Sequence, residues 1–318
     1  MFPTRRITKP RRAVLLAVLS LGSSTLASSA MTLGAQEREV MRPKPAEPPS
    51  LALAHRIAYP TRIAVDADDN VYVTDIRVGS VFILDPYLQP RLELKGLAEP
   101  AGIAVDHDGR IYVGSKGRQS VEVYSGTGRL LYELGAGPGE FSLPTDITVA
   151  PDARVFVADS FQNCVKVFDR RGRRLKVIGG EGTGPGEFKF PSSLTLSPDA
   201  TELYVGDQGN YRIQVFDLNG GFLREFGGHV ERGAFEGRFA RIQSVATVID
   251  PEIGTTIHVV DTAQNWIQVL TGNGEYLRSY GETGRSPGKL NLPLDIACNS
   301  LGRVIVCNSG NGRVEHID

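Results

Sequence analysis

A unit of about 40–50 residues repeats six times along this chain, and this repeat restricts the possible fold more than any other feature. The clearest copy begins at Pro144 and contains four short runs, DITVA, RVFVAD, CVKVFD and RLKVIG, which are rich in β-branched and aromatic residues. Equivalent positions open the six units: Pro60, Pro100, Pro144, Pro191, Ile242 and Pro293. A β-branched residue always follows the end of the second run at a distance of six residues, a regularity that random β-rich sequence would not produce.

Four strands in each repeat predict the blades of a β-propeller rather than a solenoid of helices. A four-stranded sheet has two apolar faces and cannot bury them alone. Stacking the sheets around an axis buries both faces, and closing the ring protects the edges. We therefore predict an all-β fold, a six-bladed β-propeller of four-stranded antiparallel blades.

The last repeat ends at its third run, VEHID, so its fourth strand must come from elsewhere in the chain. Residues 51–57 alternate in polarity and lie just before Pro60. We predict that these residues supply the missing strand. The ring is then closed by an N-terminal strand, and the propeller domain covers residues 51–318.

The N-terminus has the pattern of an export signal. A basic segment precedes the apolar run AVLLAVLSLG, which is too short to span a bilayer as a helix. We interpret residues 1–30 as a signal peptide and the polar, proline-rich residues 31–50 as a disordered linker. Arg11 and Arg12 leave the twin-arginine route open beside the general secretory route. The expected location is extracytoplasmic, either periplasmic or secreted.

Charge and cysteine content narrow the possible partners and cofactors. The formal charge is −1, and removal of residues 1–30 leaves −6, which does not suit the binding of a nucleic-acid backbone. Cys164, Cys298 and Cys307 form an odd set for which we predict no disulfide. We expect a monomer with no cofactor, no metal site and no membrane span after signal cleavage.

The repeats IAVDADDNVYVTD, IAVDHDGRIYVGS and LYVGDQGNYRIQVFD, with the linkers GAGPGEF and GTGPGEF, resemble NHL repeats. The resemblance covers roughly residues 51–318 and implies a six-bladed propeller of an exported bacterial type. Similar propellers serve as extracytoplasmic sensors, as RNA- or protein-binding platforms in tripartite-motif proteins, and as the peptidyl-hydroxyglycine amidating lyase. The resemblance therefore leaves several functions open.

One face of such a propeller carries the blade-to-blade linkers and the loops between second and third strands, and we expect the binding site at this mouth. Residues that differ between repeats are the best ligand-binding candidates. We predict that the ligand-binding residues are Arg62, Asp146, Tyr211, Arg212, His229, Trp266, Asp295 and Arg313. Phe161 adds a further aromatic residue to these loops. The alternative is that these rings pack beneath neighbouring linkers.

A polar residue ends the second strand in most repeats: Asp75, Asp159, Asp207, Asp261 and Asn308. These residues could suggest a metal cluster. Repetition in nearly every blade instead indicates a structural role, in which the side chain accepts hydrogen bonds from the amides of the loop that it begins. We interpret all five as loop-capping residues.

The favoured function is an exported, non-catalytic binding or sensor propeller that recognises a small ligand, glycan, peptide or protein at its loop-lined mouth. The alternative is a metal-assisted lyase or hydrolase related to the amidating lyase, using mouth carboxylates and His229. The lyase family holds zinc through three histidines, whereas only His229 falls in a mouth-side loop here. RNA binding is disfavoured by the acidic charge.

Export gives the first prediction. In its host, the protein should lose about 30–35 residues from its N-terminus and be found outside the cytoplasm. N-terminal sequencing of the folded protein checks this, and an intact Met1–Ala30 segment would contradict it.

Overall fold

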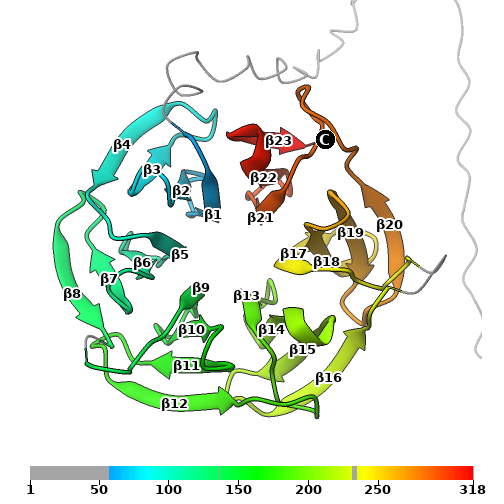
Figure 1. The fold of residues 1–318 in the computed structure, drawn as a ribbon, viewed down its shortest axis with the longest axis horizontal. Coiled ribbons are helices and arrows are strands. Elements are labelled where there is room, and N and C mark those ends of the chain that lie inside the picture. Colours follow the sequence, from blue (N-terminus) through cyan, green and yellow to red (C-terminus); the bar gives the residue numbers. More distant parts are fainter. Residues whose placement is uncertain (1–56, 136, 231–234, 318) are drawn as a thin grey trace, which may run out of the picture. The chain divides into compact units, whose positions relative to one another are not determined.

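The computed structural model describes residues 57–135, 137–230 and 235–317. These residues form six antiparallel sheets arranged around a central axis, as Figure 1 shows. The only helical elements among them are two single turns of 3-10 helix, η1 (Gln208–Asn210) and η2 (Ser309–Asn311), and no helix in the described part could span a bilayer. The predicted all-β, six-bladed propeller is confirmed.

We number the blades in chain order. Blade 1 contains β1 (Pro60–Val65), β2 (Val71–Asp75), β3 (Ser80–Leu84) and β4 (Pro90–Lys95). Blade 2 contains β5 (Pro100–Val105), β6 (Ile111–Ser115), β7 (Ser120–Tyr124) and β8 (Leu130–Leu134). Blade 3 contains β9 (Pro144–Val149), β10 (Val155–Asp159), β11 (Cys164–Phe168) and β12 (Arg174–Gly179). Blade 4 contains β13 (Pro191–Leu196), β14 (Glu202–Asp207), β15 (Arg212–Asp217) and β16 (Phe222–Gly227). Blade 5 contains β17 (Ile242–Asp250), β18 (Gly254–Asp261), β19 (Trp266–Thr271) and β20 (Tyr276–Tyr280). Blade 6 contains β21 (Pro293–Cys298), β22 (Val304–Asn308) and β23 (Arg313–Ile317).

Each blade runs from an innermost first strand to an outermost last strand. The linkers and the loops between second and third strands therefore share one end of the propeller, which we call the linker face. The remaining hairpin turns share the other end, the turn face. Blade 6 has three strands among the described residues. The fourth strand predicted at residues 51–57 lies outside the described part, except for Ile57.

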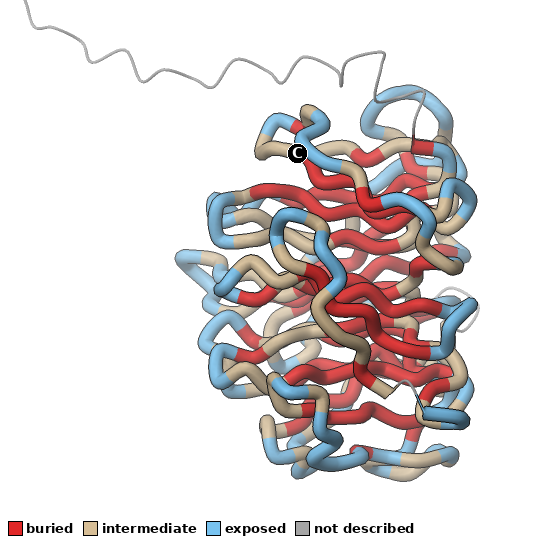
Figure 2. The backbone as a smooth tube through the Cα atoms, turned by 90° about the vertical axis from the view of Figure 1, so that its left-hand side faces the viewer, coloured by how far each residue is buried: buried red, intermediate tan, exposed pale blue. Residues whose placement is uncertain are grey.

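The hydrophobic core is divided into six clusters, one at each interface between neighbouring blades. At the interface that closes the ring, Val73 and Phe82 of blade 1 pack with Ile305 and Val314 of blade 6. Figure 2 shows the buried strands as stacked layers. Each blade thus buries both faces against its neighbours, as the repeat predicts.

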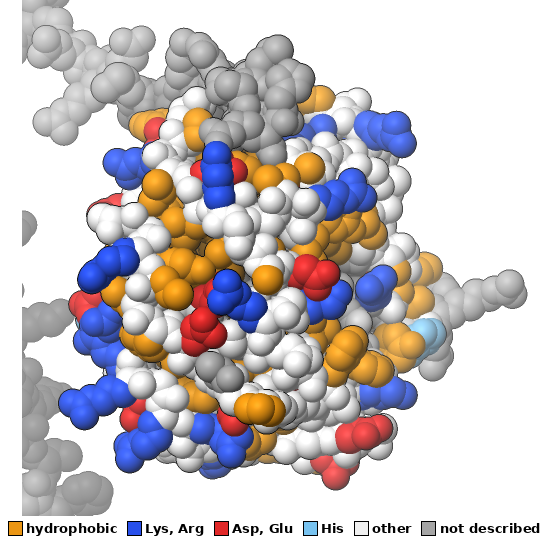
Figure 3. Space-filling view, turned by 60° about the vertical axis from the view of Figure 1, so that its left-hand side comes forward, with side chains coloured by type: hydrophobic (Ala, Val, Ile, Leu, Met, Phe, Trp, Pro, Cys, Tyr) orange, Lys and Arg blue, Asp and Glu red, His pale blue; other side chains and the backbone are white. Residues whose placement is uncertain are grey.

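The outer surface seen in Figure 3 carries charges of both signs. Figure 3 shows Lys and Arg side chains mixed with Asp and Glu and with hydrophobic side chains over one side of the propeller. The strongly basic surface that binds a nucleic-acid backbone is not seen on that side.

The first strand of every blade begins with an irregular register against the second strand. In β1 the shift falls between Pro60 and Arg62, and the five other first strands have the same shift at their openings. A bulge of this kind bends the strand and changes the direction of the neighbouring side chain. The second residue after each opening position is therefore the one whose orientation the bulge sets.

The longer linkers each bury one large apolar side chain: Phe141, Phe188, Phe239 and Leu290. The glycine before the linker allows the close packing. Gly179 has φ +81°, and a Cβ at this position would lie 2.3 Å from the ring of Phe188. The recurrent GxGPGEF sequence is thus a packing motif.

Closure of the ring gives the second prediction. Ile57 is only 5% exposed and belongs to the core between blades 6 and 1, next to the segment predicted to pair with β23. Burial of each aliphatic side chain contributes roughly 1.5–3 kcal/mol. Deleting residues 51–57 should therefore lower the thermal unfolding midpoint clearly or cause aggregation through an open strand edge. Deleting residues 1–47 should leave the midpoint almost unchanged, and equal midpoints for the two deletions would contradict closure by this strand.

Candidate functional site

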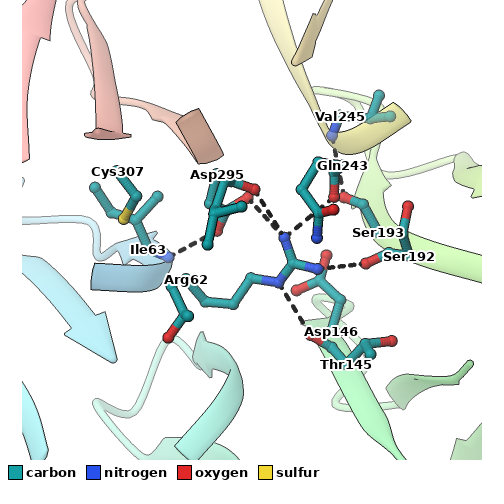
Figure 4. A network of polar contacts seen from close by, with 12 residues as sticks. Arg62, Ile63, Thr145, Asp146, Ser192, Ser193, Gln243, Val245, Asp295 and Cys307 are labelled. Carbon is teal, nitrogen blue, oxygen red and sulfur yellow. Dashed lines mark hydrogen bonds and ion pairs between the residues drawn. The ribbon is translucent and has the colours of Figure 1, made fainter. Parts of the chain in front are cut away.

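Arg62 extends from β1 into the central channel, where it is 4% exposed. Its guanidinium donates hydrogen bonds to backbone carbonyl oxygens of four other blades, as Figure 4 shows. The acceptors are Thr145 (3.0 Å), Ser192 (2.6 Å), Gln243 (3.2 Å) and Leu294 (3.1 Å). Each acceptor is the residue directly after the opening position of its blade. One side chain thereby connects blades 1, 3, 4, 5 and 6 at the axis.

Two carboxyl groups from other blades lie beside this guanidinium. Asp295 Oδ1 is 3.5 Å from Arg62 Nη1, and Asp295 Oδ2 accepts a 2.7 Å hydrogen bond from the N–H of Ile63. Asp146 Oδ2 accepts a 2.8 Å bond from the N–H of Leu194. Each carboxyl group therefore joins its own blade to the next. The structure brings Arg62, Asp146 and Asp295, three of the predicted ligand-binding residues, together at the axis.

Burial dominates the titration of these carboxyl groups. It raises the pKa of Asp295 to about 7, although the nearby Arg62 lowers it, and the negative charge of Asp146 raises it further. Burial also raises the pKa of Asp146, again opposed by Arg62. Two carboxyl groups share one guanidinium, so full ionisation leaves one uncompensated negative charge at the channel.

A cavity of about 230 Å³ lies on the side of this network that faces away from the linker face. It is lined by the first strands of all six blades, with Asp146, Ser193 and Asp295 at one end and Cys298 among the residues at the other. Residues near the Cys298 end are partly exposed, whereas Asp146 and Asp295 are buried. The cavity therefore opens toward the turn face, opposite the expected mouth.

The predicted ligand-binding residues Arg212 and Arg313 have structural contacts instead of free guanidinium groups. Arg212 is buried at the start of β15; it bonds Asp207 at 2.8 Å and donates three 2.8 Å bonds to carbonyl oxygens of the linker 180–190. Arg313 occupies the same position in blade 6 and donates to carbonyl oxygens of the linker 281–292. Both arginines belong to strands, and both fix the path of a linker.

The residues that end the second strands complete these clamps. Asp75, Asp159, Asp207, Asp261 and Asn308 are fully buried. Their side-chain oxygens accept backbone N–H bonds from the linker that leads into their own blade. The donors are Ala58 and Tyr59 for Asp75, Ser142 and Leu143 for Asp159, Lys189 for Asp207, Ala240 and Arg241 for Asp261, and Asn291 for Asn308. These contacts agree with a loop-capping role.

The linker face of blades 3 to 5 carries three edge-to-face aromatic pairs. The pairs are Phe161–Phe190, Tyr211–His229 and Phe235–Trp266, with ring centroids 6.5, 4.3 and 5.8 Å apart. In every pair one ring comes from a second-to-third-strand junction and the other from a linker. Phe190 and Phe235 were not predicted from the sequence, because only folding brings these linkers beside the loops.

Exposure distinguishes the three pairs. Phe161 is 61% exposed and Phe190 is 44% exposed, whereas Trp266 and Tyr211 are half-buried against linker residues. The two sequence interpretations, an exposed cluster and rings packed beneath linkers, therefore apply to different pairs. His229 is exposed and lies against Tyr211 rather than beside a carboxyl group of the channel.

Within residues 57–135, 137–230 and 235–317, no three His, Cys, Asp or Glu side chains are grouped so that they could hold a metal ion. His258 is buried in β18, 2.8 Å from the hydroxyl of Tyr280, and burial lowers its pKa to about 4.

A family model described as a six-bladed β-propeller matches residues 149–228. Similar solved structures include a gluconolactonase from Xanthomonas campestris, at 17% identity over 84% of this chain and 96% of the other, with a TM-score of 0.61. A streptogramin B lyase matches at 14% identity over 79% and 91% of the chains, with a TM-score of 0.57. Virginiamycin B lyase from Staphylococcus aureus matches at 16% identity over 81% and 84%, with a TM-score of 0.55. At these identities the similarity shows the propeller fold.

The channel carboxyl groups give the third prediction. Because the folded-state pKa of Asp295, about 7, lies above its ordinary value of 3.8, its contribution to stability is greatest below that ordinary value and is lost as the pH rises to about 7. The free energy of unfolding of Asp295→Asn relative to the wild type should therefore increase with pH across this window, by up to roughly 4 kcal/mol, and then level off.

Chemical denaturation at several pH values measures this difference. Asp68→Asn, which alters an exposed aspartate in the β1–β2 turn, is the matched control and should give a difference that varies little with pH. A pH-independent difference for Asp295→Asn would contradict the raised pKa.

Proposed function

We propose that this protein is an exported, non-catalytic propeller of the NHL type that recognises a polypeptide partner through the linker face of blades 3 to 5. The observation that carries the proposal is the set of three aromatic pairs on this face. Aromatic residues are enriched in protein interfaces and dominate their binding energy. Phe161 and Phe190 are the most exposed pair and form the expected anchor.

The polar groups of the same loops are already engaged, which favours a polypeptide over a glycan. Gln162 donates to the carbonyl of Gly139, and Asn163 accepts the N–H of Phe190. Asn210 donates to the carbonyl of Gly182. Glycan recognition needs unoccupied hydrogen-bonding groups, whereas apolar contact between rings and a partner's side chains does not.

The linkers that carry the rings are held before any partner binds. Arg212 and Asp207 clamp the linker 180–190, which ends at Phe190. Side chains held in place beforehand lose less conformational entropy on binding. The clamps thus support a rigid aromatic surface rather than an induced one.

A metal-assisted lyase or hydrolase is the second candidate. Two of the similar solved structures described above are lyases and one is a gluconolactonase. The local observation in its favour is Asp295, a buried carboxyl group whose pKa of about 7 is suited to acid–base chemistry. His229 lies apart from this group, so such chemistry would belong to the channel rather than to the linker face.

The fourth prediction tests the aromatic surface with a defined probe. Peptides selected from a random phage-displayed library against the folded wild-type protein should bind Phe161→Ala/Phe190→Ala at least about tenfold more weakly, the usual loss for an anchor pair. Both rings are largely exposed, so the thermal unfolding midpoint should change little. Tyr87→Ala is the control, since Tyr87 is a 72% exposed aromatic residue in a β3–β4 turn on the opposite face.

Selected peptides that bind the double variant as well as the wild type would overturn the assignment of this surface. Equal losses for Tyr87→Ala and the double variant would do the same. The midpoint, measured for each variant, separates lost recognition from lost folding.

A further inference from the structure

The walls of the central cavity are formed by the first strands of the six blades, whose inner edges face the channel. Each first strand is hydrogen-bonded to the second strand on one side only, so alternate N–H and C=O groups on its other side point to the channel. Some of these N–H groups are taken by side chains of the preceding blade, as Ile63 is by Asp295 and Val245 is by Ser193. The remaining carbonyl groups make the lining an acceptor-rich surface.

Arg62 shows which kind of group the inner edges of the first strands accept directly beside the cavity. Its guanidinium is the protein's own N–H-bearing cation, and it is held by carbonyl oxygens of four blades with distances of 2.6–3.2 Å. It closes the channel on the linker side of the cavity. The cavity beyond it is surrounded by the same six strands.

The charge at the closed end of the cavity is not balanced by protein groups. Asp146 and Asp295 both line the cavity, and Arg62 is the cation beside them. A cation entering from the turn face would meet two carboxyl groups and compensate the second one. In its absence the site must take up a proton or carry a buried charge.

We propose that this cavity is a binding site for a small organic cation with N–H donors, a primary ammonium group being the simplest case. The ammonium group lies at the end formed by Asp146 and Asp295, and the remainder of the molecule points toward the turn face. This site is separate from the aromatic surface on the linker face and does not depend on it.

The hydrogen bonds already made by the carboxyl groups favour an ammonium ion over a metal ion. Both oxygens of Asp146 accept backbone N–H bonds, from Ile147 and Leu194, and Asp295 Oδ2 accepts one from Ile63. Each oxygen can accept one more donor, as an ammonium group requires. Among the described residues, no three His, Cys, Asp or Glu side chains are grouped here to hold a metal ion, so the two carboxylates alone give a metal too few protein ligands. The cavity volume of about 230 Å³ far exceeds the roughly 10–15 Å³ that a single water needs, so it has room for several non-hydrogen atoms.

The first hairpin of blade 5 is longer than its counterparts in the other blades. β17 has nine residues and β18 has eight, whereas the other first strands have six, so this hairpin projects beyond its neighbours at the turn face. Ile249 and Ile253 on the projecting part are 63% and 47% exposed, and Leu301 in the adjacent blade 6 turn is 72% exposed. The longest hairpin of the turn face thus carries exposed aliphatic side chains.

The fifth prediction uses n-butylammonium chloride as the probe, with isothermal titration calorimetry on the full mature protein. Wild type should bind it with a measurable affinity at pH 8, and n-butanol, which has the same chain without the charge, should bind at least tenfold more weakly. Asp295→Asn and, independently, Asp146→Asn should each weaken binding of the ammonium probe by about tenfold or more. Asp68→Asn, an exposed aspartate in a turn on the same face, should bind as the wild type does.

Proton release gives a second readout that a merely structural role for Asp295 would not produce. The titratable groups around the cavity are Arg62, Asp146, Asp295, Cys298 and Cys307. Burial raises the pKa of Cys298 to about 12 and that of Cys307 well above its usual value, so both thiols stay neutral. Cation binding near pH 6 should therefore release a proton from Asp295, seen as a dependence of the heat on buffer ionisation, and the affinity should fall from pH 8 to pH 6.

The proposal is overturned if wild type binds no ammonium probe, if Asp295→Asn and Asp146→Asn both bind it as tightly as the wild type, or if Ca²⁺ or K⁺ binds there more tightly than the ammonium probe. Phe161→Ala/Phe190→Ala should leave amine binding unchanged. That variant therefore separates a failure of the cavity site from a failure of the linker-face proposal.

Discussion

The structure depends on how the backbone N–H and C=O groups at the inner edges of the blades find hydrogen-bond partners. Six first strands meet at one axis, and each has an edge of backbone groups with no neighbouring strand to pair with. Side chains at the second position after each blade opening resolve part of this problem, since Asp146, Ser193 and Asp295 accept N–H groups of the following blade. Arg62 donates to the carbonyl groups. The channel is thus a network of side chain to backbone bonds rather than an apolar core.

This network is asymmetric, and its asymmetry determines its chemistry. The six equivalent positions carry Arg62, Gly102, Asp146, Ser193, Ser244 and Asp295. Gly102 is required at its position, because a Cβ there would lie 2.9 Å from the backbone of Asp146. The charged members of the set are one cation and two acids. Burial is the main cause that raises the pKa of Asp295, Arg62 opposes it, and the negative charge of Asp146 adds to it. A ring of six identical residues would be neutral or uniformly charged, and it would have neither the guanidinium that closes the channel nor the excess carboxyl group beside it.

The repeated positions made the fold predictable from the sequence. The candidate site was only partly predictable, because it is formed by positions that differ between the repeats. Strand openings and the constant six-residue offset recur in every unit, and a capping aspartate recurs in four of the six. The six-bladed fold and the position of Asp207 or Asp261 could therefore be inferred from spacing. The same comparison found the variable ring at the channel. It could not show that Arg212 turns back onto its linker, because the carbonyl groups that bind it come from residues about 25–29 positions earlier. Phe190 was missed for a related reason, since its partner Phe161 lies on another loop.

The two ends of the channel are therefore free to differ in function while the blades stay alike. The core clusters between blades use the alternating residues inside the strands, and substitutions there would disturb packing on both sides of a blade. Linker tips and the second position of each first strand contribute little to those clusters. A repeat protein can change these positions one at a time without changing the fold. The aromatic pairs on the linker face and the carboxyl groups of the cavity lie at such positions, which is a physical reason to seek recognition where the repeats differ.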